Sequence, residues 1–66
     1  MKVVINGEIK EIATKINLQA LLKNLSLASE RIAVELNKEV VSKKDWENIE
    51  INEADKIEII HFVGGG

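Results

Sequence analysis

The segment Lys56-Ile57-Glu58-Ile59-Ile60-His61-Phe62-Val63 decides the fold of this 66-residue chain. In an extended strand, Ile57 and Ile59 point to one side, and Ile60 and Phe62 point largely to the other. Apolar side chains on both faces are typical of a strand in the centre of a sheet. Residues 56–63 are therefore predicted to form a central strand.

Residues 2–5, Lys-Val-Val-Ile, have the same two-sided apolar character and are predicted to lie beside that strand. Since these are the first and last strands, a helix on one face can join them in parallel. Asn6-Gly7 is a strong hairpin signal, because both residues tolerate positive φ. Residues 8–13 should then return as a weak edge strand. Ile9 and Ile12 lie three apart, which a bulge in that strand would explain.

One main helix is predicted after this hairpin. Asn17 can cap its N-terminus. Four leucines follow with the spacing of one helix face, namely Leu18, Leu21, Leu22 and Leu25. Because so short a helix is marginal alone, packing against the sheet must hold it.

The middle of the chain predicts a second hairpin. Residues 31–36 alternate cleanly between apolar and polar or small side chains. Asn37-Lys38 is predicted to be a tight turn, and Val40-Val41 forms the returning strand.

A single helical turn is predicted around Trp46. Ser42 and Asp45 resemble a capping box that would open it. A lone Trp in a small domain is usually a core residue, and we expect that role for Trp46. Ile49 and Ile51 then predict a brief extended piece, and residues 53–55 a turn.

The order of a hairpin, a helix and then strands with a central final strand is that of the β-grasp, or ubiquitin-like, topology. We predict an α+β fold with a mixed sheet of four to five strands and one main helix packed on one face. A chain of this length makes one domain, residues 1–66, without room for a deep internal pocket. Residues 62–66 are expected to be a mobile C-terminal tail.

Composition argues against several classes of function. The chain has no cysteine and one histidine, so neither a Cys/His metal cluster nor a thiol nucleophile is expected. A net charge of −2 with one Trp, one Phe and no Tyr is unlike a nucleic-acid-binding protein. The apolar run near the N-terminus is too short for a signal peptide or a membrane span. We expect a cytoplasmic protein, monomeric when free, that binds no metal or cofactor itself.

Three glycines, Gly64-Gly65-Gly66, close the sequence. Without side chains they make a thin thread, and residues 63–66 reach at most about 14 Å when extended. Such a thread could deliver the Gly66 carboxylate into another protein's active site. Adenylation there, followed by attack of a sulfur nucleophile, would convert it to a thiocarboxylate. From the glycines alone, a structureless tail is the simpler interpretation.

Several segments resemble the ThiS family, the sulfur carriers of thiamin biosynthesis. The resemblance covers the whole chain, beginning at Ile5-Asn6-Gly7. It is carried by Val-Glu-Leu-Asn-Lys-Glu-Val-Val at residues 34–41, by Asp45-Trp46, and by Asp-Lys-Ile-Glu-Ile-Ile-His-Phe-Val-Gly-Gly-Gly at residues 55–66. Its most specific parts are the position of the Trp and the ending His-Phe-Val-Gly-Gly-Gly. A terminal Gly-Gly alone is shared by many β-grasp carriers.

The resemblance implies a reaction. The family's terminal glycine, here Gly66, is adenylated by a ThiF-type activating enzyme that uses ATP and Mg²⁺. Sulfur arrives from a cysteine desulfurase pathway, and the thiocarboxylate then donates it to thiazole synthase. Gly64 and Gly65 would thread into the partners' sites, and Phe62 and Val63 are candidates for docking. The chain would be a co-substrate rather than an enzyme.

The chain departs from the family in three turns. Lys38 and Ala54 stand where Gly is frequent, and Ser42-Lys43-Lys44 replaces a frequent Pro-Arg before the Trp. These changes concern turn geometry and partner specificity rather than Gly66. Two alternatives stay open: a small subunit of molybdopterin synthase, and a ubiquitin-like modifier or interaction module. His61 is expected to have a structural or rim role, and Lys43-Lys44 to be a solvated face.

Overall fold

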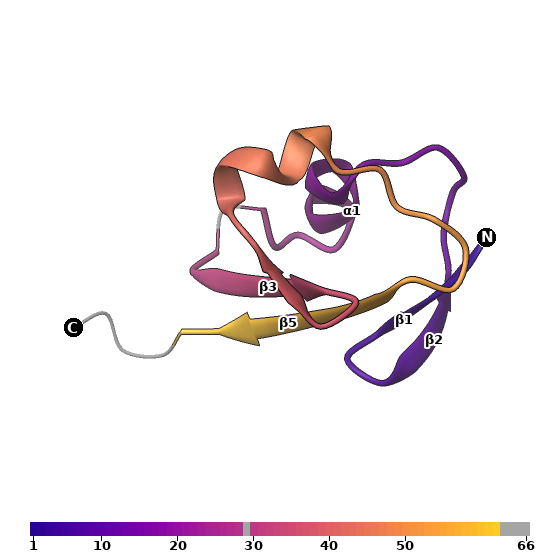
Figure 1. Cartoon of the computed structure of the whole chain (residues 1–66), viewed down its shortest axis with the longest axis horizontal. Helices are drawn as coiled ribbons and strands as arrows, with labels where there is room; N and C mark the ends of the chain where they lie inside the picture. The colour runs from indigo at the N-terminus through magenta and orange to yellow at the C-terminus, as the bar shows by residue number, and fades with distance from the viewer. Residues whose placement is uncertain (29, 63–66) are drawn as a thin grey trace.

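The computed structural model describes residues 1–28 and 30–62. Five strands form one mixed sheet in the order β2-β1-β5-β3-β4 (Figure 1). They are β1 (Lys2–Ile5), β2 (Glu8–Glu11), β3 (Ile32–Leu36), β4 (Glu39–Val41) and β5 (Lys56–His61). β5 pairs in parallel with β1 and antiparallel with β3, so the predicted central last strand beside the first strand is confirmed.

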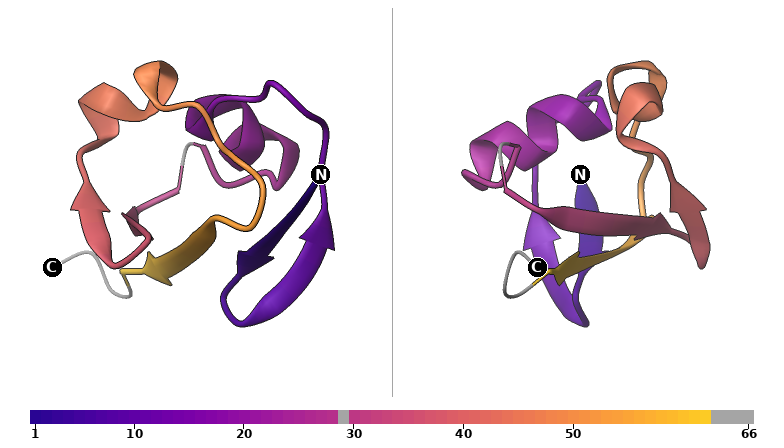
Figure 2. Two further views of the ribbon diagram at one scale, coloured as in Figure 1. Left: turned by 45° about the vertical axis from the view of Figure 1, so that its right-hand side comes forward. Right: turned by 90° about the vertical axis from the view of Figure 1, so that its left-hand side faces the viewer.

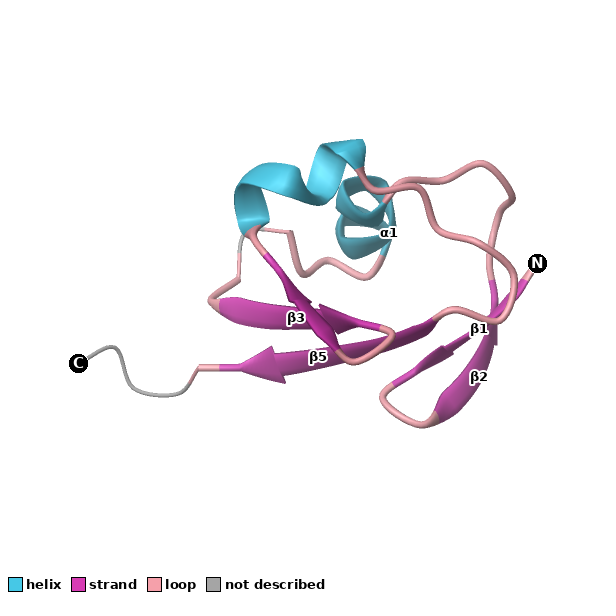
Figure 3. Cartoon of the chain, viewed as in Figure 1, coloured by secondary structure: helices cyan, strands magenta, loops and turns pink. Residues whose placement is uncertain are grey.

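Both helical segments lie on one face of this sheet (Figure 3). The main helix is α1 (Leu18–Asn24), and a 3-10 helix, η1 (Lys43–Asn48), lies beside it. Asn17 caps α1 as predicted, because its Oδ1 accepts a hydrogen bond from the Ala20 N–H at 2.7 Å. The arrangement is the predicted one of a mixed sheet with one main helix on one face.

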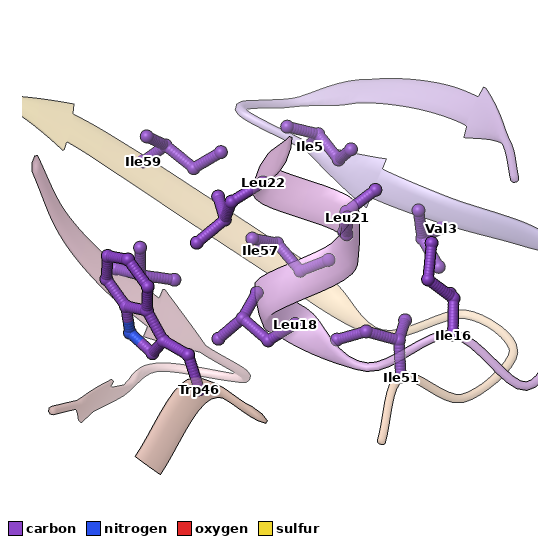
Figure 4. Packing of buried hydrophobic residues seen from close by; sticks show 11 residues of the cluster. Val3, Ile5, Ile16, Leu18, Leu21, Leu22, Trp46, Ile51, Ile57 and Ile59 are labelled. Carbon is purple, nitrogen blue, oxygen red and sulfur yellow. The ribbon is translucent and has the colours of Figure 1, made fainter. Parts of the chain in front are cut away.

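Apolar side chains from the sheet and from the helical layer meet in a single cluster (Figure 4). Leu18, Leu21 and Leu22 of α1 are buried and face Ile57 of β5. Leu25 was predicted to continue that leucine face, and this is wrong: it is the C-cap of α1 and is 37% exposed. Since the helix ends at Asn24, helical periodicity no longer points the next side chain inward.

Both predicted hairpin turns are confirmed, and both have a left-handed backbone. Asn6 and Gly7, between β1 and β2, have φ of 49° and 83°. Asn37 and Lys38, between β3 and β4, have φ of 51° and 72°. Two consecutive positive φ values match the right-handed twist of the flanking strands, which fixes the register of both hairpins.

The bulge suggested for residues 8–13 is wrong. β2 pairs with β1 in an unbroken register from Lys2–Glu11 to Ile5–Glu8, and its four residues are all exposed. The strand stops at Glu11, and Ile12 then packs against the core. The three-residue spacing of Ile9 and Ile12 therefore reflects the end of the strand.

The capping box before Trp46 is also wrong, although the helical segment itself is confirmed. Ser42 precedes η1, but its side chain makes no capping hydrogen bond. Its carbonyl instead accepts the Asp45 N–H at 2.9 Å, the tighter closure of a 3-10 turn. The predicted extended piece at residues 49–51 pairs with the segment before α1, through a bridge between Asn17 and Glu50.

Candidate functional site

The candidate site begins where β5 ends. β5 lies between the β1–β2 hairpin and the β3–β4 hairpin (Figure 2, left). Past the last strand residue, the Phe62 N–H still donates to the Arg31 carbonyl oxygen at 2.9 Å. The chain is thus held by the sheet up to Phe62. The predicted site residues Val63, Gly64, Gly65 and Gly66 lie outside the described residues.

On the edge of β5 that faces β1, a side chain continues the row of backbone hydrogen bonds between the two strands. The Asn6 N–H donates to the Ile57 carbonyl oxygen at 2.9 Å. One step further along β5, the Asn6 side chain takes over: its Oδ1 accepts the Ile59 N–H at 2.7 Å, and its Nδ2 donates to the Ile59 carbonyl oxygen at 3.2 Å. One carboxamide therefore pairs with both backbone groups of Ile59.

The sheet face opposite the helices carries exposed apolar side chains near this end of β5. Val40 is 74% exposed, Ile60 50% and Phe62 61%. We call these three residues the outer patch. Phe62 was a predicted docking residue and is accessible for that role, whereas Val40 was not singled out from the sequence.

Two glutamates lie opposite each other on this same face of the sheet. Glu35 of β3 is the direct partner of Glu58 of β5, and Val40 of β4 is the next partner of Glu35. Like charges directly opposite on neighbouring strands weaken a sheet. The sequence showed two separate glutamates, and only the register of three strands brings them together beside the outer patch.

The other residues singled out in the sequence lie as expected. Trp46 is 1% exposed, and its Nε1 donates to the Val41 carbonyl oxygen at 3.3 Å, so the predicted core role is confirmed. His61 is exposed at the end of β5, and Lys43 and Lys44 are exposed on η1.

The described residues offer little to hold a small molecule. A shallow pocket of about 180 Å³ is lined by Lys2, Val3, Val4, Ile9, Glu53 and Ala54. It is smaller than the clefts of roughly 300–1,000 Å³ that bind cofactors. Within residues 1–28 and 30–62, no three His, Cys, Asp or Glu side chains gather as metal ligands, and no helix is long and apolar enough to cross a membrane.

Comparison with known proteins gives consistent results. The model of the ThiS family matches residues 3–66. The sulfur carrier protein ThiS of Bacillus subtilis is 43% identical over 49 residues, 74% of each chain. A solved structure of a thiamine biosynthesis protein (ThiS) from Geobacter metallireducens superposes with a TM-score of 0.87 at 32% identity, over 100% of both chains. The predicted β-grasp fold is thereby confirmed.

A third relative is longer. A thiazole synthase of Paramagnetospirillum magneticum is 42% identical over the whole of this chain, which covers 20% of that protein. The chain therefore spans about a fifth of the length of this relative.

Proposed function

The chain belongs to the ThiS family, and from this membership we propose that it is a sulfur carrier of thiamin biosynthesis whose reactive group is the terminal carboxylate of Gly66. The observation that carries the proposal is the family match through residue 66, together with a relative named as a sulfur carrier. The described fold supports it, because β5 is a central strand held by the sheet, and only Phe62 and Val63 separate it from the glycines in the sequence.

The proposed chemistry needs a partner enzyme. A Gly66 carboxylate oxygen attacks the α-phosphorus of ATP, and pyrophosphate leaves with the partner's Mg²⁺. Hydrosulfide then attacks the acyl-adenylate carbon and AMP leaves, so that one sulfur replaces one carboxylate oxygen. Where the nucleophile is a protein persulfide, the product is an acyl disulfide, and a thiol must attack the donor's sulfur, forming a disulfide with it, to free the thiocarboxylate. A ThiF-type activating enzyme would bind the ATP, and a cysteine desulfurase pathway would supply the sulfur. The carrier itself would be a co-substrate and not a catalyst.

Thiazole synthase is the proposed acceptor of the sulfur. The support is the Paramagnetospirillum magneticum thiazole synthase, which contains a segment alignable with this whole chain. A segment similar to this chain within a protein named thiazole synthase is consistent with a carrier and an acceptor that work together.

The outer patch is the proposed docking surface. Exposed Val40, Ile60 and Phe62 offer apolar contact close to the strand that leads to the tail. The facing pair Glu35 and Glu58 costs folding stability, which a basic side chain of a partner would relieve on binding. We therefore expect partner surfaces that combine apolar and basic residues.

Intact-protein mass spectrometry tests the proposal. Incubation with the activating enzyme, ATP, Mg²⁺ and a sulfur source should give the mass gain of one sulfur-for-oxygen exchange. Deletion of Gly66 should abolish this gain without changing the circular dichroism spectrum. Lys10→Ala, on the exposed β2 edge, is the matched control and should load normally. Sulfur uptake by the deletion variant would contradict the proposal, and a ladder of isopeptide conjugates would favour a modifier.

A further inference from the structure

The turn between β1 and β2 reaches the strand that leads to the tail, although it is far from the tail in sequence. In the antiparallel ladder with β3, Phe62 turns its N–H to Arg31, so alternate residues of β5 turn their backbone groups to β1. Ile57 and Ile59 are two of these alternate residues. Backbone groups of the β1 segment form hydrogen bonds with Ile57. At Asn6 the chain turns away from β5 with φ of 49°, so the β1 segment does not continue as a strand beside Ile59.

The Asn6 carboxamide fills that gap. With Oδ1 accepting at 2.7 Å and Nδ2 donating at 3.2 Å, it pairs with both backbone groups of Ile59, as a further strand residue would. β5 is therefore held on both edges one step beyond the end of β1. A strand held on one edge alone twists more freely than one held on both.

We propose that Asn6 is a positioning residue for the C-terminal tail: its carboxamide holds Ile59 and so fixes the direction of β5 up to Phe62, from which the tail starts. The inference rests on the proposed function, because a preset direction matters only if the tail must enter a partner's site. Preorganisation lowers the ordering cost of binding, so Asn6 should affect how well the activating enzyme binds the carrier rather than the chemical step.

The chain contains its own matched control. Asn37 occupies the first position of the other hairpin turn, with φ of 51°. Its Oδ1 accepts the Lys56 N–H at 2.9 Å, and its Nδ2 donates to Asp55 Oδ1 at 3.0 Å. Asn37 thus bonds the backbone N–H of Lys56, the first residue of β5, whereas Asn6 bonds both backbone groups of Ile59, closer to the tail.

The test compares Asn6→Gly with Asn37→Gly. Glycine keeps the positive φ of both turns and removes only the side-chain bonds. In Asn6→Gly, hydrogen exchange of the Ile59 amide should become about ten-fold faster, while the Phe62 amide keeps its protection. The KM of the activating enzyme for the carrier should rise about three- to ten-fold with kcat little changed. Asn37→Gly should change neither the Ile59 exchange nor KM.

Each other result overturns the inference. Unchanged Ile59 exchange in Asn6→Gly would show that the carboxamide does not hold β5. Faster exchange with an unchanged KM would show that the bond does not position the tail. Equal rises in KM for both variants would assign the effect to general stability. If the wild type is never adenylated, the proposed function fails by itself, and the exchange measurement alone decides whether Asn6 holds Ile59.

Discussion

Asn17 and Ser42 occupy equivalent positions before their helices, yet only one of them caps. The Asn17 side chain accepts the Ala20 N–H, whereas the Ser42 side chain makes no capping bond. Asn17→Ala should lower the free energy of unfolding by about 1 kcal/mol. Ser42→Ala, the matched control, should change it by less than about 0.5 kcal/mol. Urea unfolding followed by Trp46 fluorescence measures both, and equal losses would contradict the assignment.

Trp46 links η1 to the sheet through burial and through its bond to the Val41 carbonyl oxygen. Trp46→Ala should cost about 3–5 kcal/mol. Because a domain this small has little stability to spare, the variant should be largely unfolded at 25 °C. Far-UV circular dichroism and proton NMR dispersion check this. A native spectrum for Trp46→Ala would show that η1 contributes little to the fold.

Among the elements, β3 and β5 bring two like charges together beside the proposed docking surface. The ladder places Glu35 and Glu58 directly opposite each other, an arrangement of like charges that is expected to weaken a sheet. Glu58→Gln should raise the free energy of unfolding by about 0.2–1 kcal/mol. The gain should shrink in high salt, where exposed charges are screened. Glu47→Gln, exposed on η1, is the control and should have little effect; a loss of stability in Glu58→Gln would contradict the repulsion.

An element could be predicted where its sequence pattern is local, and could not where the feature depends on residues far apart in the sequence. β5 and α1 were predictable because the apolar periods of residues 56–63 and of the leucines are local. The outer glutamate pair was not, because it depends on the register of strands far apart in sequence. The Ser42 cap failed because the spacing of Ser42 and Asp45 does not distinguish an α-helical start from a 3-10 turn. The pairing of Asn6 with Ile59 needed the parallel neighbour to be known.

At the scale of the whole molecule, the sheet separates the packed core from the proposed docking surface. One face packs on α1 and η1 (Figure 3). The exposed side chains of the outer patch lie on the other face. Leu22→Ala on the packed face should cost about 2–5 kcal/mol of stability. Phe62→Ser, on the open face, should change stability by less than about 0.5 kcal/mol.

Phe62→Ser should affect partner binding more than it affects the stability of the fold. Phe62→Ser should weaken binding of the activating enzyme by about 1–2 kcal/mol, measured by calorimetry. Lys10→Ala, on the edge strand β2, should bind as the wild type does. Undiminished binding of Phe62→Ser would remove the outer patch from the proposed docking surface.

The central place of β5 has a consequence for how the molecule is made. The hairpins β1–β2 and β3–β4 are not neighbours in the sheet; only β5 joins them, and it follows both in the chain. A lone hairpin is marginal in water. On a ribosome, which delivers the chain N-terminus first, both hairpins must therefore wait for β5 to emerge. Since β5 precedes the glycine segment in the sequence, the proposed carrier should become active only once its fold is complete.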